Sequence, residues 1–177
     1  MERSCESVPF SVSTRPPRSV SLWLRDGFIA ATICWAGLIV AVPFLASRAH
    51  ASTPASLLIV GVYGIGSLVC HQLPARSYHL WTVQLPVCAR CTGIYFGAVF
   101  GTLGWICVAR STDLLRFGSL RHARVLLGIA AAPTVLSLVY EWSTGDMPSN
   151  AIRAAAGIPI GFVVAWLVVA AADNQVN

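Results

Sequence analysis

Lysine is absent from this 177-residue chain, and charged residues of any kind make up only 11% of it. Soluble domains carry about 25% charged residues, so this chain has too few to cover the surface of a water-soluble globule. All twelve basic residues are arginines, against seven acidic residues. The arginines stand between apolar segments rather than in one basic stripe. This pattern argues against nucleic-acid binding and favours positions at the ends of membrane spans.

Hydrophobic residues make up 56% of the chain. They gather in five runs, at about residues 28–46, 55–70, 86–109, 123–140 and 154–172. A helix needs about 20 residues to cross the hydrocarbon core, and a backbone in lipid must satisfy its own hydrogen bonds. The sequence therefore predicts an all-α fold, a polytopic transmembrane helix bundle of about five spans. The second run is the shortest, so four spans are the alternative.

The predicted organisation has two parts. Residues 1–27 are polar and rich in arginine and proline, and we expect a disordered tail there. Residues 28–172 are expected to form the transmembrane helical domain of a multi-pass protein, with the lipid bilayer as its partner, in the bacterial cytoplasmic membrane. Five spans would place the tail, the 71–85 loop and the 141–153 loop on one side, with the last two together in either orientation. One side of the membrane would then carry seven arginines and the other five, which leaves the orientation open.

Glycines recur every four residues in two of the runs: Gly93, Gly97 and Gly101 in the third, and Gly157 and Gly161 in the fifth. Glycines at this spacing line one face of a helix and let another helix approach closely. They predict close helix packing, and these glycine-rich faces are also candidates for contacts in a homo-oligomer.

Three of the six cysteines gather in one segment of 22 residues: Cys70, Cys88 and Cys91, together with His71 and His79. The spacing of Cys88 and Cys91 suits either one metal ion or one redox pair. Pro86 predicts a helix start just before Cys88. The partial positive charge at a helix N-terminus favours the thiolate, which is the form that binds metal or attacks.

The leading interpretation is a metal site formed by the three cysteines with either His71 or His79. Zinc fits this set best, while copper(I), an iron–sulfur centre or no metal are the alternatives. A membrane thiol oxidoreductase using Cys88 and Cys91 is a second interpretation. A structural membrane protein with the cysteines as a disulfide staple is a third, suited to an oxidising compartment. Whether the protein is an enzyme stays open.

Six polar residues near this segment are candidates for supporting the metal ligands or for binding an anion: Gln72, Arg76, Arg90, Glu141, Asn150 and Arg153. An ionisable residue near membrane depth is costly unless it is paired. We therefore expect a Glu141–Arg153 pair close to the cysteines. As alternatives, Ser149 or Asn150 could cap the fifth helix and Arg153 could anchor it at the headgroups.

One stretch carries a family resemblance: Cys-His-Gln-x3-Arg-Ser-Tyr, from residue 70, followed by Leu-Pro-Val-Cys-x-Arg-Cys-x-Gly-Ile-Tyr-x-Gly. It resembles a family of predicted prokaryotic membrane proteins classed as a domain of unknown function. The resemblance is dense over residues 70–97 and extends more weakly to about residue 161. It implies a multi-pass membrane protein and no particular activity. In the fourth span the family carries an Asp and later a Gln, where this chain has Ser137 and Glu141.

Overall fold

The structure is a computed structural model that describes residues 18–48, 53–109 and 120–174. The described residues form five helices, α1 (Arg18–Ala46), α2 (Thr53–Val69), α3 (Ala89–Ala109), α4 (Leu120–Thr144) and α5 (Asn150–Asn174). The segment between α2 and α3 adds a short 3-10 turn, η1 (Pro74–Arg76), and two paired strands, β1 (His79–Leu80) and β2 (Val83–Gln84). Four helices, α1, α3, α4 and α5, are long and apolar enough to cross a membrane. The prediction of an all-α membrane bundle is confirmed, apart from the small hairpin.

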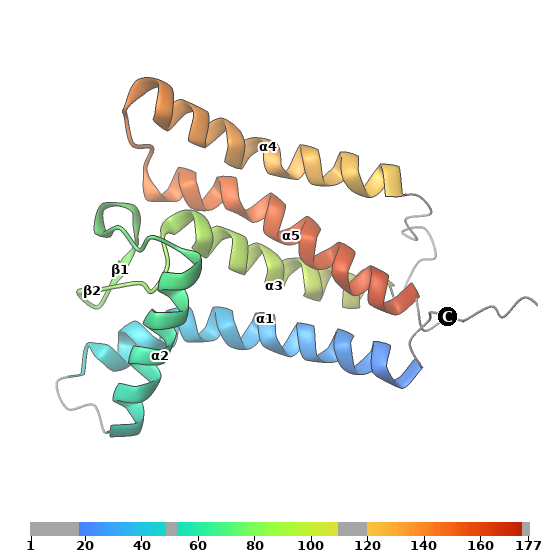
Figure 1. Cartoon of the computed structure of the whole chain (residues 1–177), viewed down its shortest axis with the longest axis horizontal. Coiled ribbons are helices and arrows are strands. Elements are labelled where there is room, and N and C mark those ends of the chain that lie inside the picture. The colour runs from blue at the N-terminus through green and yellow to red at the C-terminus, as the bar shows by residue number, and fades with distance from the viewer. Residues whose placement is uncertain (1–17, 49–52, 110–119, 175–177) are drawn as a thin grey trace, which may run out of the picture.

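The fifth helix, α2, differs from the others in length and direction. Figure 1 shows α1, α3, α4 and α5 running along the long axis of the molecule, while α2 is steeply inclined across one end of α1. Its 17 residues extend about 26 Å as a helix, less than the roughly 30 Å of a hydrocarbon core. The four-span alternative is therefore the one that the structure supports.

Four spans change which segments share an end of the bundle. The α2 helix, the hairpin and the α4–α5 turn lie together at what we call the cysteine end (Figure 1). The starts of α1 and α4 and the last turn of α5 lie at the opposite end. The predicted pairing of the Cys loop with the 141–153 loop is confirmed, since Asn150 Nδ2 donates to the Ser77 carbonyl at 3.1 Å. The predicted pairing of the Cys loop with the N-terminal side of the first span is wrong, because the start of α1 lies at the opposite end of the bundle (Figure 1).

Helix α1 begins at Arg18, ten residues before the predicted start of the helical domain. Polar residues join the helix here because they pack on the bundle: Ser21 is buried, and Arg25 Nη1 lies 2.6 Å from Asp173 Oδ1 of α5. The boundary at residue 27 is therefore wrong, and the expected disordered tail can concern only residues 1–17, which lie outside the described residues.

The glycines of α3 and α5 face each other. A Cβ atom on Gly97 would lie 2.3 Å from the Ile158 carbonyl oxygen, and one on Gly161 would lie 1.9 Å from that of Ile94. Only glycine allows the two backbones to approach this closely. Close packing is confirmed, but it takes place within one chain. These faces are buried between α3 and α5, and a homo-oligomer stays a prediction.

The hairpin turns at Trp81 and Thr82, whose φ angles are 51° and 68°. Two-residue hairpin turns need positive φ at both positions and usually use Asn and Gly. Here a tertiary contact holds the turn, since the Trp81 ring packs edge-on against Phe44 of α1, with 5.1 Å between centroids. The hairpin therefore lies against α1 at the cysteine end, beside the segment that leads to Cys88.

A three-thiol cluster beside an arginine cluster

Three thiols meet at the cysteine end. Cys70 directly follows α2, Cys88 directly precedes α3, and Cys91 lies in the first turn of α3. Their Sγ atoms all lie within 4.8 Å of one another, and all three are free thiols. Zinc–sulfur bonds of about 2.3 Å in a tetrahedron place the sulfurs about 3.8 Å apart. A small contraction would therefore let the three sulfurs share one ion.

The start of α3 fixes two of these sulfurs. The Cys88 carbonyl accepts hydrogen bonds from the Thr92 amide at 2.9 Å and from Thr92 Oγ1 at 3.1 Å, which makes Cys88 the cap of the helix. The Cys88 amide donates to Cys70 Sγ at 3.2 Å. The predicted helix start after Pro86 is confirmed, and the same backbone that begins α3 also holds Cys70.

Cys88 is poised as a thiolate. Its pKa is lowered to about 5, chiefly because the Cys91 thiol donates a hydrogen bond to its sulfur. The backbone amides of Cys91 and Arg90 and the Cys70 thiol act in the same direction, while burial opposes them. At neutral pH this sulfur is therefore in the form that binds metal.

The side-chain amide of Gln72 joins the end of α2, which precedes Cys70, to the segment that precedes Cys88. Gln72 Nε2 donates to the Tyr63 carbonyl of α2 at 2.9 Å and to the Pro86 carbonyl at 2.7 Å. The Gln72 carbonyl accepts a hydrogen bond from Gln84 Nε2 at 2.5 Å. Gln72 reaches both partners from a positive φ of 46°, which costs a non-glycine residue about 1–2 kcal/mol. It joins the end of α2 to the segment before Cys88.

Two residues of this arrangement were missed from the sequence. A Cβ atom on Gly66 would lie 2.3 Å from the Pro86 carbonyl oxygen, so only glycine lets α2 approach the segment before Cys88. Gln84 holds the Gln72 backbone from β2. A glycine one turn before Cys70 was the signal for the first, whereas nothing in the sequence pointed to Gln84.

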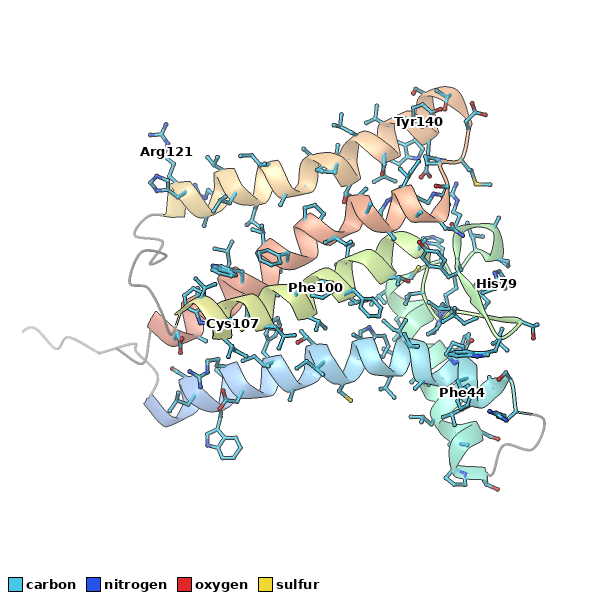
Figure 2. The ribbon with its side chains drawn as sticks, turned by 180° about the vertical axis from the view of Figure 1, so that it is seen from behind. Phe44, His79, Phe100, Cys107, Arg121 and Tyr140 are labelled. Atoms are coloured by element: carbon cyan, nitrogen blue, oxygen red, sulfur yellow. The ribbon has the colours of Figure 1, made fainter. Side chains whose placement is uncertain are left out.

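The two candidate histidines are placed differently. His71 is exposed and lines the same cavity as the three cysteines. His79 lies in β1, at the outer edge of the hairpin in Figure 2, and is not among the residues lining this cavity. The ligand atoms that lie within 4.8 Å of one another belong to the cysteines and to neither histidine. Of the two, His71 is the one that a side-chain rotation could bring to a metal held by the sulfurs.

An arginine cluster lies next to the thiols. Glu141 Oε1 of α4 accepts hydrogen bonds from Arg90 Nη2 at 2.6 Å and from Arg153 Nε at 3.0 Å. Arg76 Nη1 lies 3.7 Å from Glu141 Oε2. The predicted Glu141–Arg153 pair forms, with side chains only 3% and 2% exposed. Three cations therefore meet one carboxylate at the buried join of α3, α4, α5 and the η1 turn.

Arg90 contacts two residues of α4, Ser137 and Glu141. Its Nη2 donates to Ser137 Oγ at 3.0 Å as well as to Glu141. Residues 137 and 141 lie one turn apart on the same face of α4. Arg90 therefore joins the start of α3 to two successive turns of α4.

Asn150 contacts neither the three thiols nor the arginine cluster. Its Nδ2 donates to the Ser77 carbonyl, which fastens the start of α5 to the loop after η1. The helix-capping contact comes from Ser149 Oγ, which accepts from the Ile152 amide at 3.4 Å. Asn150 therefore holds the loop that carries Arg76 rather than the metal ligands.

A cavity of about 320 Å³ joins the thiols to the arginines. It is lined by Val69, Cys70, His71, Gln72, Leu73, Arg76, Cys88, Arg90, Cys91 and Arg153. All the predicted metal ligands except His79 thus face one space, together with four of the six predicted supporting or anion-binding residues, Gln72, Arg76, Arg90 and Arg153.

Four apolar helices with a thiol and arginine site at one end define a polytopic membrane protein. The chain belongs to the family described as "Predicted membrane protein (DUF2085)", which it matches over residues 70–167, more than half of its length. It is 36% identical over 61 residues to an uncharacterized protein of Methanocaldococcus jannaschii, covering 34% of this chain and 39% of that protein. It is 29% identical over 101 residues to an uncharacterized protein of Methanothermobacter thermautotrophicus, covering 56% and 83%. The chain thus spans less than half the length of the first relative, and no solved structure matches it.

Proposed function

We propose that this protein is a membrane metalloprotein that holds one metal ion, zinc in the first place, through Cys70, Cys88 and Cys91. The observation that supports this is the meeting of three Sγ atoms within 4.8 Å from segments on both sides of the loop. Soft thiolate ligands select zinc, copper(I) or iron–sulfur clusters. Iron–sulfur clusters are usually held by four thiolates. Three sulfurs with one nitrogen or one open position fit a single zinc ion best.

The fourth position decides what such an ion can do. If His71 binds, the ion has four protein ligands and holds the loop together, as structural zinc does. If His71 stays in the cavity, the fourth position is open to a small ligand, as in catalytic zinc sites. We place the site at one face of the cytoplasmic membrane of a bacterial cell.

Metal analysis of the full chain purified in detergent tests the proposal. We expect about one zinc per chain in the wild type, and less than about a tenth of that in Cys88→Ser, since each thiolate is a ligand. The matched control is Cys107→Ser, which removes an exposed thiol that Figure 2 places at the opposite end of the bundle. A wild type without stoichiometric metal, or equal metal in both variants, would contradict the proposal.

The two histidines provide a second matched pair. Both are exposed, so neither replacement should disturb folding. His71→Ala is expected to weaken zinc binding about tenfold or more if His71 completes the tetrahedron, while His79→Ala is expected to leave it unchanged. The reverse result would assign the fourth ligand to His79.

One observation favours a second candidate function, a thiol redox pair. The Sγ atoms of Cys88 and Cys91 lie within 4.8 Å of each other, and the pKa of Cys88, lowered to about 5, gives a nucleophilic thiolate beside a resolving thiol. This function predicts a Cys88–Cys91 disulfide that forms and reduces reversibly. Thiol trapping in cells distinguishes the candidates, because a zinc site protects both thiols until a chelator removes the metal.

A further inference from the structure

The arginine cluster carries more positive charge than its carboxylate can balance. Arg76, Arg90 and Arg153 face Glu141 alone, which leaves a net charge of +2. A divalent metal on three thiolates would add −1 beside it, and the cavity would still hold +1. Uncompensated charge at this depth is costly, so its presence calls for a partner of opposite sign.

Unpaired donors lie beside the cavity. Among the described residues, Arg153 Nη2 and Arg90 Nε are buried and have no hydrogen-bond partner. The Arg153 side chain is 98% buried and lines the cavity, together with Arg90 and Arg76. Buried guanidinium N–H groups are normally paired, and planar arginine forks match the oxygens of phosphate and carboxylate groups.

We propose that this cavity binds the phosphate group of an anionic ligand, held by Arg76, Arg90 and Arg153 beside the three thiols. A phosphate group carries one to two negative charges, which matches the net charge of +2 at the arginine cluster itself. Its tetrahedral oxygens can accept from several guanidinium groups at once.

The cavity opens where lipid headgroups lie. Val69 and Leu73 line it and are both exposed, which gives its mouth an apolar edge. Trp81 and Trp142, exposed at the same end, mark the level of the membrane interface. The phosphate can therefore come from an anionic lipid or from solution, and the chemistry of the site is the same in both cases.

The test uses the full chain and two arginine variants. Inorganic phosphate, titrated against equal ionic strength of chloride, should raise the melting temperature of the detergent-solubilised protein. Arg76→Gln should weaken phosphate binding about tenfold, because it removes one charged donor. Arg76 is partly exposed, so the variant should fold. Arg48→Gln is the matched control: it removes the same charge from an exposed position at the same end, outside the cavity.

A second arm identifies the source of the phosphate. The wild type and both variants are placed in nanodiscs of phosphatidylglycerol or of phosphatidylcholine. Stabilisation by phosphatidylglycerol that depends on Arg76 assigns a lipid phosphate, whereas stabilisation by inorganic phosphate alone assigns a soluble one, and either result supports the proposal. No stabilisation in either arm, or equal losses in Arg76→Gln and Arg48→Gln, would overturn it.

The proposal does not depend on the metal ion, because the arginines supply the donors. Cys88→Ser is therefore expected to lose metal and keep phosphate binding. If Cys88→Ser lost phosphate binding while Arg76→Gln kept it, the anion would belong to the metal and the arginine site would be refuted. A failure of the metal proposal and a failure of the phosphate proposal are thus separate results.

Discussion

Each end of the helix bundle has a carboxylate that bonds to arginine, and the two carboxylates are placed very differently. At the opposite end, Asp173 Oδ1 lies 2.6 Å from Arg25 Nη1, and its Oδ2 accepts from Trp105 Nε1 at 2.9 Å. Both oxygens are used, and the side chain is 26% exposed. At the cysteine end, Glu141 is almost fully buried, meets three arginines, and has an Oε2 without a hydrogen bond.

The two ends differ in whether their charged groups are fully paired. The net charge at the opposite end is −1, from Arg25, Asp26 and Asp173. Asp173 of α5 binds Arg25 of α1 through one carboxylate oxygen and Trp105 of α3 through the other. The cysteine end carries +2 and keeps unpaired donors beside a cavity. The extra arginines and their unpaired donors are the features that the proposed phosphate site accounts for.

The largest expected effect concerns which end faces the cytoplasm. The opposite end has Arg18, Arg25, Arg121 and Arg124 at the starts of α1 and α4, and the sequence leading into these two helices carries four more, Arg3, Arg15, Arg110 and Arg116. The cysteine end has four arginines, Arg48, Arg76, Arg90 and Arg153. The positive-inside rule then predicts that the opposite end is cytoplasmic and the thiols face outward.

Reporter fusions check this orientation with an all-or-none readout. Green fluorescent protein fused after residue 177 should fluoresce, and alkaline phosphatase fused after Gly145, in the α4–α5 turn, should be active. Exchanging the two reporters is the control and should abolish both signals. An inverted pattern would place the thiols on the cytoplasmic side. Thiols are kept reduced there, so a disulfide would not compete with metal binding.

The next largest effect contrasts the two carboxylates. Glu141→Gln leaves the buried Arg153, together with Arg90 and the partly exposed Arg76, without a counter-charge, and should lower the free energy of unfolding by about 3–5 kcal/mol. Asp173→Asn keeps the shape of a half-exposed pair and should cost about 1 kcal/mol. Thermal unfolding in detergent measures both. Phosphate should restore more stability to Glu141→Gln than to the wild type, and equal losses in the two variants would erase the distinction between the ends.

A smaller effect concerns how the cysteine end holds its ligands. Gln72→Gly permits the positive φ of 46° but removes the amide that joins α2 to the Pro86 carbonyl. Loss of such a supporting contact typically weakens metal binding about 10–100-fold. Competition with a chromogenic chelator measures the zinc affinity of the purified variant. Unchanged affinity would show that Gly66 and the α3 cap position the sulfurs without the amide.

The sequence was sufficient for the parts of this molecule that depend on composition and spacing. Charge depletion and run length predicted the membrane helices, and the Cys88-x2-Cys91 spacing with Pro86 predicted the thiols at a helix start. The inclination of α2 could not be predicted, because a 17-residue apolar run is compatible with both a short span and a surface helix. The partners of Arg90 were equally hidden, since Ser137 and Glu141 meet it only through the packing of α4.

The smallest expected effect tests whether the two ends act independently. Trp105→Phe removes the N–H that donates to Asp173 while keeping a ring to pack edge-on against Trp166, whose centroid lies 5.4 Å away. A hydrogen bond to a charged group contributes about 1.5–3 kcal/mol, and solvent reduces this at the partly exposed Asp173, so the melting temperature should fall slightly. Zinc content and phosphate binding should not change, because no described contact of Trp105 reaches the cavity at the cysteine end. If either fell with Trp105→Phe, α3 and α5 would be transmitting strain along their glycine-packed faces, and the separation of a fastening end from a binding end would not hold.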